Sequence, residues 1–264
     1  MAADILSRIV ATTRETVAAA QARRPLADLK ARASGASPVR PFLPDSDPRP
    51  VSIIAEIKRA SPSKGDIAID LDPARLAASY EAGGAAALSV LTDAPFFKGS
   101  ALDLMTARAA VSLPVLRKDF IVTEYQVYEA RSWGADAVLL IARILSPHQM
   151  AELCACVRAL GMEPLVEIHT EADLETIPGA CARLIGINNR DLKSFDTSLD
   201  RAIGLAGRLA PHQVPVAASG IAAREDIARN LAHGIRHFLI GESLVRAADP
   251  VAFLKDLANI EETP

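Results

Sequence analysis

The chain has 264 residues, of which 50% are hydrophobic and only 4% aromatic, and its formal net charge at neutral pH is −3. This length fits one large domain or two small ones, and α/β barrels of a single domain fall within the range. A nucleic-acid-binding or membrane-surface protein usually has a basic excess, which is absent here. An anionic ligand would therefore need a local cluster of cations.

The sequence gives three indications of compartment. No apolar run is long enough to span a bilayer, and the first residues lack the apolar core of a signal peptide. The cysteines are Cys154, Cys156 and Cys181, and their spacing matches neither a zinc site nor a disulfide framework. We therefore expect packed or idle thiols in a reducing compartment, a cytoplasmic protein, and no membrane or nucleic-acid partner.

The first fifty residues differ from the rest. Ala2–Arg24 is predicted to form an amphipathic helix and Pro25–Ala33 a shorter one, whereas Ser34–Pro50 contains five prolines and no periodicity. We interpret 1–50 as a helical extension and linker packed on a catalytic domain formed by 51–264.

From residue 51 onward a strand-loop-helix unit recurs. Asp72-Pro73 and Ser146-Pro147 are typical helix starts, and glycines such as Gly134 and Gly161 are typical helix ends. The intervening strands are mostly continuous apolar runs, as in parallel strands buried on both faces. The eight predicted strands are Ser52–Lys58, Ala86–Thr92, Pro114–Lys118, Ala137–Ala142, Pro164–Ile168, Leu184–Asn188, Val214–Ser219 and His237–Gly241.

Eight such units favour a single closed (β/α)8 TIM barrel. No glycine-rich dinucleotide turn follows the first strand, which argues against a doubly wound sheet, the alternative fold. In a barrel of this kind the chemistry lies at the carboxyl ends of the strands.

The first strand carries the most informative residues. Glu56 and Lys58 lie two residues apart and so share one face of a strand, and a Ser/Pro/Lys/Gly loop follows them. This pattern fits one side of an acid/base site for an anionic substrate. A strand-end salt bridge beside a solvated loop is the alternative.

Other strands also end in polar residues, which favours the site over the salt bridge. The third predicted strand ends in Arg117-Lys118-Asp119-Phe120, the fifth in Glu167 and His169, and the sixth in Asn188-Asn189-Arg190-Asp191. Histidines at strand ends are more often surface groups, so we do not assign His169 to the site. The remaining His148, His212 and His233 are interpreted as solvated.

The last two strand ends suggest a phosphate site. Ser219-Gly220-Ile221 and Gly241-Glu242-Ser243 each follow an apolar strand and could open a helical turn, whose backbone N–H groups favour phosphate. Glycines that merely permit tight turns are the alternative. Phe96-Phe97, in a predicted loop after the second strand, could cover an apolar ligand or simply pack within the loop.

These residues occur in blocks that resemble the indole-3-glycerol-phosphate synthase family over almost the whole chain. The blocks appear in the family's order, which is more specific than any one motif. They are Ala55–Gly65 (AEIKRASPSKG), Leu88–Ser100 (LSVLTDAPFFKGS), Leu116–Val122 (LRKDFIV), Ala135–Leu145 (ADAVLLIARIL), Pro164–Ile168 (PLVEI), Ile185–Leu192 (IGINNRDL), and Ala218–Ile221 with Leu239–Leu244.

The resemblance implies an enzyme of tryptophan biosynthesis with no metal or organic cofactor. It would cyclise 1-(2-carboxyphenylamino)-1-deoxyribulose 5-phosphate to indole-3-glycerol phosphate with release of carbon dioxide and water. This small phosphorylated substrate would be its partner, and we expect the protein to be a monomer or weak homodimer.

The resemblance also implies residue roles. Lys118 would be the general acid and Glu167 would stabilise the anilino nitrogen, with Glu56 and Lys58 in the same acid/base network and Asn188 and Arg190 orienting the substrate. Which of Glu56, Lys58 and Glu167 serve in dehydration stays open. The positions that match the family's phosphate site are Lys58, Ser61, Ser219, Gly220, Gly241 and Glu242. Ser219 would also belong to the catalytic set. The positions that match the walls around the aromatic ring are Phe97, Phe120, Leu139 and Leu192.

The chain departs from the family at one place. Relatives often carry Glu immediately before the Ser-Gly of the seventh strand, where this chain has Ala218. Two other functions are compatible with the residues: a Schiff-base aldolase with a phosphate site, in which Lys118 or Lys58 forms the adduct, and a non-catalytic barrel that only binds a phosphorylated ligand.

Overall fold

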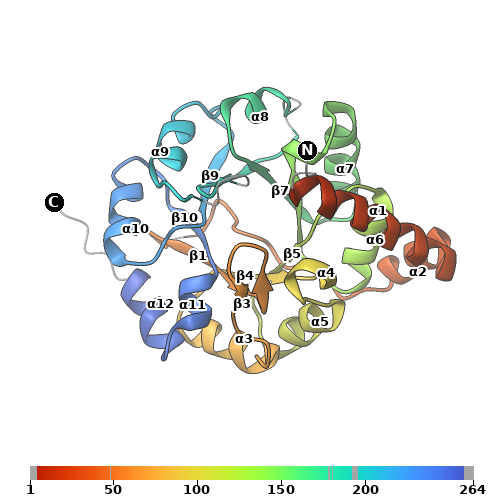
Figure 1. Cartoon of the computed structure of the whole chain (residues 1–264), viewed down its shortest axis with the longest axis horizontal. Coiled ribbons are helices and arrows are strands. Elements are labelled where there is room, and N and C mark those ends of the chain that lie inside the picture. Colours follow the sequence, from red (N-terminus) through yellow and green to blue (C-terminus); the bar gives the residue numbers. More distant parts are fainter. Residues whose placement is uncertain (1–4, 48, 178, 180, 192–195, 259–264) are drawn as a thin grey trace.

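The computed structural model describes residues 5–47, 49–177, 179, 181–191 and 196–258. Within them, eight parallel strands close into a barrel in the order β1-β10-β9-β8-β7-β6-β5-β4 (Figure 1). The (β/α)8 prediction is confirmed, and the open doubly wound sheet is not formed. The barrel strands are β1 (Ser52–Ile57), β4 (Ala87–Leu91), β5 (Val115–Lys118), β6 (Ala137–Ile141), β7 (Glu163–Ile168), β8 (Leu184–Asn188), β9 (Val214–Ala218) and β10 (His237–Ile240).

Helices surround the barrel and alternate with its strands. Each predicted strand agrees with the structure to within one residue at either end. The helices are α1 (Ile5–Arg23), α2 (Leu26–Ser34), α3 (Pro73–Ala82), α4 (Ala94–Phe97), α5 (Ala101–Ala110), α6 (Glu124–Ser132), α7 (Pro147–Ala159), α8 (Glu171–Glu175), α9 (Asp200–Ala206), α10 (Arg224–Leu231), α11 (Glu242–Arg246) and α12 (Pro250–Ala258), with a 3-10 turn, η1 (Ala142–Ile144).

The helix starts form for the expected reason. The Asp72 carboxylate accepts hydrogen bonds from the backbone N–H groups of Ala74 and Arg75, and Pro73 occupies the first turn of α3. Ser146 and Gln149 form a capping box at the start of α7. A small antiparallel hairpin, β2 (Ala60–Ser61) and β3 (Gly65–Asp66), was not predicted from the sequence.

Side-chain alternation along the strands divides the core into two layers. Residues such as Ile53 and Ala55 face outward into the layer between strands and helices, whereas Ile54, Leu116 and Leu165 fill the barrel interior. The next inward position on each of those three strands, two residues farther on, is polar. The strand pleat therefore places an apolar layer inside the barrel, below the polar side chains at the carboxyl ends of these three strands.

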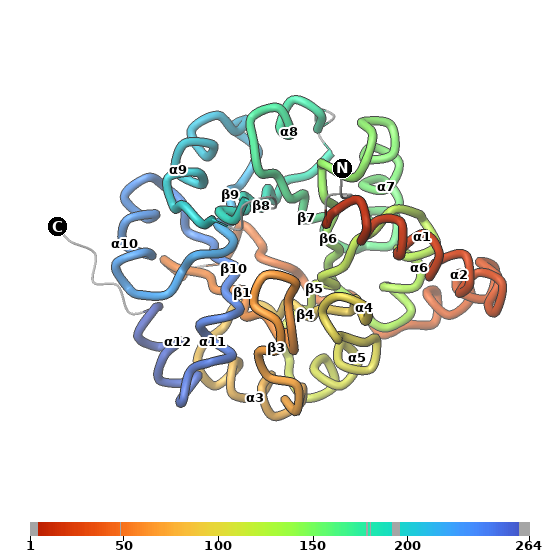
Figure 2. The backbone as a smooth tube through the Cα atoms, in the orientation of Figure 1, coloured from red at the N-terminus to blue at the C-terminus, as the bar shows by residue number. Residues whose placement is uncertain are grey.

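The extension contacts the barrel at both of its ends. Leu29 and Val17 pack with Tyr125 of α6, and the start of α1 lies on the β6 and β7 side of the barrel (Figure 2), where it lines the cavity at the carboxyl ends of the strands. Phe42 and Leu43 are buried inside the amino end of the barrel. The division at residue 50 into an extension and a catalytic domain stays a prediction.

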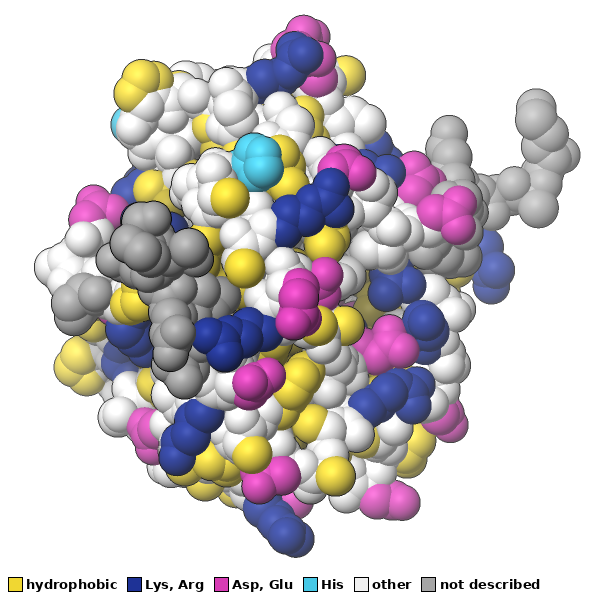
Figure 3. Space-filling view, turned by 90° about the vertical axis from the view of Figure 1, so that its left-hand side faces the viewer, with side chains coloured by type: hydrophobic (Ala, Val, Ile, Leu, Met, Phe, Trp, Pro, Cys, Tyr) yellow, Lys and Arg dark blue, Asp and Glu magenta, His cyan; other side chains and the backbone are white. Residues whose placement is uncertain are grey.

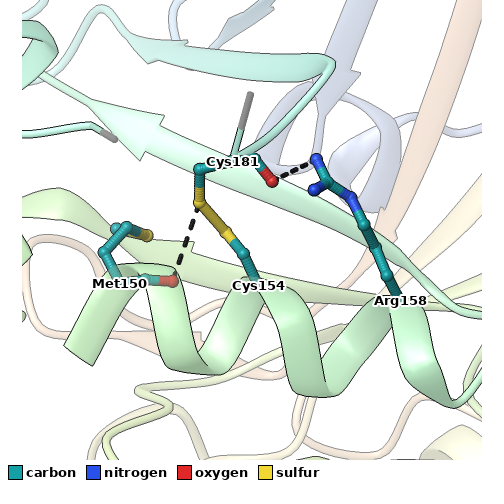
Figure 4. The surroundings of a disulfide bond; sticks show 4 residues. All are labelled: Met150, Cys154, Arg158 and Cys181. Carbon is teal, nitrogen blue, oxygen red and sulfur yellow. Dashed lines mark hydrogen bonds between the residues drawn. A yellow bond between two sulfur atoms is a disulfide. The ribbon is translucent and has the colours of Figure 1, made fainter. Parts of the chain in front are cut away.

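The prediction that the cysteines are packed or idle thiols is wrong for two of the three. Cys154 of α7 and Cys181, in the loop before β8, form a disulfide (Figure 4). The Cys181 sulfur lies 3.6 Å from the carbonyl oxygen of Met150, and Arg158 donates a hydrogen bond to the carbonyl of Cys181. Cys156 is free. The pairing joins residues 27 apart in sequence, so only the folded arrangement brings them together.

The surface carries both signs of charge. On the side covered by α9, α10 and α12, Lys and Arg side chains are interspersed with Asp and Glu, and no patch of one sign dominates (Figure 3). Arg229 and Asp200, for example, form an ion pair there. None of the helices in the described part of the chain is long and apolar enough to cross a membrane.

Candidate active site

A cavity of about 430 Å³ opens at the carboxyl ends of the strands. Its walls come from all eight barrel strands, from the loop of the β2–β3 hairpin, from α4 and α11, and from the first turns of α1. Charged side chains lie on its floor and apolar ones along one side. This is the face on which barrel proteins place their chemistry.

Two polar side chains from two other strands hold one carboxylate on the floor. The Lys118 ammonium of β5 lies 3.4 Å from Glu167 Oε2 of β7, and the Asn188 amide of β8 donates to Glu167 Oε1 at 3.2 Å. Glu167 is only 4% exposed. The carboxylate is therefore held by a cation on one oxygen and an amide on the other.

Burial and charge act against each other on this pair. Burial by itself raises the pKa of Glu167, but Lys118, His169 and Asn188 outweigh it, and the net pKa lies below the ordinary 4.5. Burial by itself lowers the pKa of Lys118, but Glu167 and Glu56 outweigh it, and the net pKa lies above the ordinary 10.5. At neutral pH the site therefore holds an ammonium and a carboxylate.

A second pair lies on β1 and in the loop that follows it. Lys58 donates to Glu56 Oε1 at 2.6 Å, and both side chains are largely buried. A Cβ atom at Gly241 would lie 2.4 Å from Glu56 Oε1 and 3.1 Å from Lys58 Nζ. The end of β10 therefore approaches this pair so closely that a side chain at position 241 would displace the Glu56 carboxylate.

Ion pairs connect the rim of the cavity. Glu242 at the start of α11 lies 3.7 Å from Arg190, 3.6 Å from Lys64 of the hairpin loop and 3.4 Å from Arg246. The Arg190 guanidinium also lies 3.5 Å from the Ser63 hydroxyl. Three cations thus surround the Glu242 carboxylate at the carboxyl ends of β1, β8 and β10.

The two turns expected to hold phosphate differ in form. Gly241 is followed directly by α11, as predicted, but the Ser219-Gly220 turn does not open a helix, and α10 begins only at Arg224. Ser219 has a φ of +67°, which is unusual outside glycine and marks a strained position. The Ser243 hydroxyl donates to the carbonyl of Ile221 at 2.9 Å, which joins the two turns.

The apolar wall is formed by Phe97, Phe120 and Leu139. The two phenyl rings are tilted against each other, with centroids 6.0 Å apart. The prediction of a loop around Phe97 is wrong, because Asp93 caps the short helix α4 by accepting from the N–H groups of Phe96 and Phe97. Burial raises the pKa of Asp93 to about 6.

Sequence reasoning missed the part of the wall that α1 supplies. Ile5, Leu6 and Ile9 line the same cavity as the phenyl rings. Their helical spacing was visible, but nothing in the sequence indicates which surface they cover.

The structure brings the predicted site residues together with one exception. Leu192 lies outside the described residues, so its prediction remains open. The others all line this cavity: Glu56, Lys58, Ser61, Phe97, Lys118, Phe120, Leu139, Glu167, Asn188, Arg190, Ser219, Gly220, Gly241 and Glu242.

Two residues close in sequence to the site residues are not located where the sequence pattern predicted. Arg117 points outward, where it pairs with Asp119 and Glu129 and stacks on Trp133. His169 is 2% exposed, so the expectation of a surface histidine is wrong. Of the other four histidines, His148, His212 and His233 are exposed as predicted, whereas His237 at the start of β10 is partly buried.

Ala218, where the family resemblance led us to expect Glu, lines the cavity. The floor carries the carboxylates of Glu56 and Glu167. No group of three or more His, Cys, Asp or Glu side chains within the described residues is arranged to hold a metal ion.

Comparisons with known proteins point to one family. The family model of indole-3-glycerol phosphate synthase matches residues 6–257. Among curated relatives, the indole-3-glycerol phosphate synthase of Desulfosudis oleivorans is 60% identical over 97% of this chain and 98% of its own. That of an Azoarcus species is 49% identical over 96% and 98%, respectively.

A more distant likeness concerns the fold alone. A solved structure of an N-acetylmannosamine-6-phosphate 2-epimerase from Clostridium perfringens aligns with a TM-score of 0.56 at 13% identity, over 73% of this chain and 86% of that one. The near full-length match to the family model and the high identity to its members decide the assignment. The chain belongs to the indole-3-glycerol phosphate synthase family.

Proposed function

We propose that the cavity carries out the reaction of this family with the residues on its floor. As a member of the family the chain is a carbon–carbon lyase of the carboxy-lyase type that acts in tryptophan biosynthesis. It cyclises 1-(2-carboxyphenylamino)-1-deoxyribulose 5-phosphate to indole-3-glycerol phosphate, releasing carbon dioxide and water. The observation that carries the residue assignment is the convergence of Lys118, Glu167 and the Glu56–Lys58 pair in one cavity.

Lys118 is the general acid of ring closure. The ring carbon that bears the carboxylate attacks the ketone carbon, and negative charge develops on the ketone oxygen. A protonated amine beside that oxygen can neutralise it by giving up a proton. The raised pKa of Lys118 keeps the amine protonated at neutral pH, and loss of carbon dioxide from the attacking carbon then restores the aromatic ring.

Glu167 stabilises the cation formed during the attack. As the ring carbon bonds to the ketone carbon, positive charge spreads to the anilino nitrogen, and a fixed carboxylate lowers the energy of that state. The lowered pKa of Glu167 keeps it ionised. Asn188 holds its Oε1, so the charge needs no rearrangement at the moment of reaction.

The Glu56–Lys58 pair carries the dehydration. Loss of water requires an acid for the departing hydroxyl and a base for the proton of the neighbouring carbon, and an ammonium 2.6 Å from a carboxylate supplies both. With Ala218 in place of a third carboxylate, Glu56 is the base nearest to Lys58 among the described residues of the floor.

The remaining residues bind the two ends of the substrate. Phe97, Phe120 and Leu139 form a slot for the aromatic ring, and the fork of Arg190 matches the geometry of a carboxylate. The phosphate is assigned to the Ser219–Ile221 and Gly241–Ser243 turns. There, the N–H groups of Glu242 and Ser243 start α11 and have no partner within the helix, and Ser61 and Lys58 complete the set.

The Schiff-base alternative fits the site less well. An amine that attacks a carbonyl must be unprotonated, and such lysines have lowered pKa values. The pKa of Lys118 is raised because Glu167 and Glu56 face it. The ammonium is thus suited to donate a proton and unsuited to attack.

We also propose that the protein acts in the cytoplasm as a monomer or weak homodimer, without a nucleic-acid partner. The mixed charges over the face in Figure 3 support the last point. The disulfide removes the thiol-based argument for a reducing compartment, so the location is inferred from the metabolic role alone.

The test is a fluorescence assay for indole formation with the purified chain and the carboxyphenylamino substrate. Turnover that requires Lys118 is the expected result, and absence of indole product would overturn the proposal. Borohydride added with the substrate should leave the mass of the protein unchanged, whereas an adduct at Lys118 or Lys58 would support the aldolase.

A further inference from the structure

A buried histidine that sequence reasoning left outside the site lies against the central carboxylate. His169 directly follows β7, and its Nε2 lies 3.6 Å from Glu167 Oε1. It is 2% exposed and does not belong to the lining of the cavity. Within the described residues neither ring nitrogen of His169 has a hydrogen-bond partner.

The turn between β7 and α8 fixes the position of the histidine. The His169 backbone N–H donates to Asp173 Oδ2 at 2.8 Å, and Asp173 forms a capping box with Thr170. The Arg143 side chain holds the same carboxylate at 3.0 Å. The imidazole is thus attached to a rigid turn, in line with the carboxylate two residues before it.

A buried imidazole without a hydrogen-bond partner lowers the stability of the fold, so its presence calls for a functional reason. A buried polar group without a hydrogen bond destabilises the folded chain, and an apolar side chain of similar size would avoid this cost. A partner lies within a few tenths of an ångström of bonding distance, and it is the carboxylate of the proposed reaction. Hydrogen bonds in active sites commonly tighten when the substrate binds.

We propose that His169 is a positioning residue, whose Nε2–H holds Glu167 Oε1 together with Asn188 while Lys118 holds Oε2. This inference rests on the proposed role of Glu167. His169 does not touch the substrate; it acts by fixing the orientation of the carboxylate that faces the anilino nitrogen.

The charged groups around the ring are compatible with a neutral imidazole. They are Glu167 on β7, Arg143 on η1, Asp173 on α8 and Lys118 on β5. Burial, aided by Arg143 and Lys118, lowers the pKa of His169 below its ordinary 6.5 despite the two carboxylates. At neutral pH the ring therefore carries one proton, and the hydrogen bond to Glu167 requires it on Nε2.

The first test compares two substitutions of the same length. His169→Gln keeps an N–H donor near the position of Nε2, whereas His169→Met keeps the volume without a donor. We expect His169→Met to lower kcat about tenfold with KM within about twofold, and His169→Gln to stay within about threefold of wild type. Each tenfold change corresponds to about 1.4 kcal/mol of transition-state stabilisation.

The pH profile separates positioning from a structural effect. Loss of a donor to the carboxylate raises the pKa of Glu167, so the acid limb of kcat should move to higher pH in His169→Met and not in His169→Gln. His237→Met is the matched control, because His237 is also a largely buried strand histidine with an unpartnered ring nitrogen, but at the amino end of the barrel. Its kcat and acid limb should match wild type.

A double-mutant cycle tests whether His169 acts through Glu167. On a Glu167→Gln background, His169→Met should cause no further loss of kcat. Fully additive losses, or a wild-type kcat and acid limb in His169→Met, would overturn the proposal. A chain whose wild type and Glu167→Gln variant turn over equally would instead overturn the proposed function of Glu167.

A measurement on wild type requires neither turnover nor a folded Met variant. Long-range ¹H–¹⁵N spectra distinguish the two neutral tautomers and the charged form of each histidine, and the His169 signals are identified by their loss in His169→Gln. The Nε2–H tautomer at neutral pH is expected. A proton on Nδ1 alone, or a charged ring, would overturn the proposal.

Discussion

Lys118 Nζ and Glu167 Oε2 lie 3.4 Å apart, on strands β5 and β7, which are separated by β6. Both side chains are the inward residues that follow a leucine two positions earlier, Leu116 and Leu165. The strand pleat that builds the apolar layer inside the barrel thus also places an acid and a carboxylate side by side above that layer. The ion pair holds both groups charged near neutral pH.

Replacing Lys118 by Met removes the proton donor and leaves the other cavity walls in place. Because a general acid acts mainly in the transition state, we expect kcat to fall by about 10²–10⁴-fold with little loss of substrate affinity. Steady-state kinetics and calorimetric titration of the substrate measure the two effects. Lys255→Met, at an exposed position on α12, is the control. Near-normal turnover in Lys118→Met would reject the assignment.

The pH dependence of kcat follows from the same pair. The pKa of Glu167 is lowered, so its stabilising charge is present above its ordinary 4.5 and is lost as the pH falls through the still lower folded value. The pKa of Lys118 is raised, so its charge is present below 10.5 and is lost only as the pH rises through the higher folded value. A profile of kcat that is flat from about pH 5 to pH 10 is expected. A limb from either group within this range would contradict it.

Gly241 is predicted to tolerate no side chain. In Gly241→Ala the new Cβ would overlap Glu56 Oε1, and the clash would separate Glu56 from Lys58. We expect kcat to fall at least about tenfold while the fold is kept, because a misplacement of about 1 Å can cost up to about 10²-fold in rate. Gly204→Ala is the control, since nothing lies within 4 Å of its added Cβ. Circular dichroism verifies folding, and unchanged kinetics in Gly241→Ala would disprove the close approach.

The Asp93 carboxylate is predicted to cost stability at neutral pH. Its pKa is raised from 3.8 to about 6, so the folded chain binds the proton more tightly than the unfolded chain, and stability falls as the pH rises between these two values. Asp93→Asn keeps an oxygen to cap α4 and has no charge. It should raise the free energy of unfolding at pH 7 by up to about 3 kcal/mol, and by much less at pH 4. Urea melts at both pH values measure this, and an equal gain at both would contradict it.

The disulfide predicts a simple count of free thiols. When the chain is unfolded in alkylating reagent without reductant, Cys156 alone should react, so mass spectrometry should find one added group. After reduction three groups should be added. The bridge closes a 27-residue separation, for which chain-entropy estimates give a stabilisation of about 3.5 kcal/mol. Three added groups without reductant would contradict the bridge.

Much of this arrangement could be predicted from the sequence, because the strands are long apolar runs between helix caps and because alternation fixes which residues face inward. The same alternation predicts that Arg117, one residue before Lys118, faces the helices, although its charge suggested the site. What could not be predicted depends on contacts between distant segments. The Cys154–Cys181 pairing, the burial of His169 and the cover formed by α1 arise only when separate loops and helices meet.

The segment before the barrel works at both of its openings. Phe42 and Leu43 fill the interior at the amino end of the barrel, whereas Ile5, Leu6 and Ile9 form part of the cavity wall at the other end. Substrate and products that cross this cavity mouth, including the carbon dioxide and the water that the reaction releases, therefore pass beside α1. A substitution in this helix could alter the rates of substrate entry and product release without changing any reacting group.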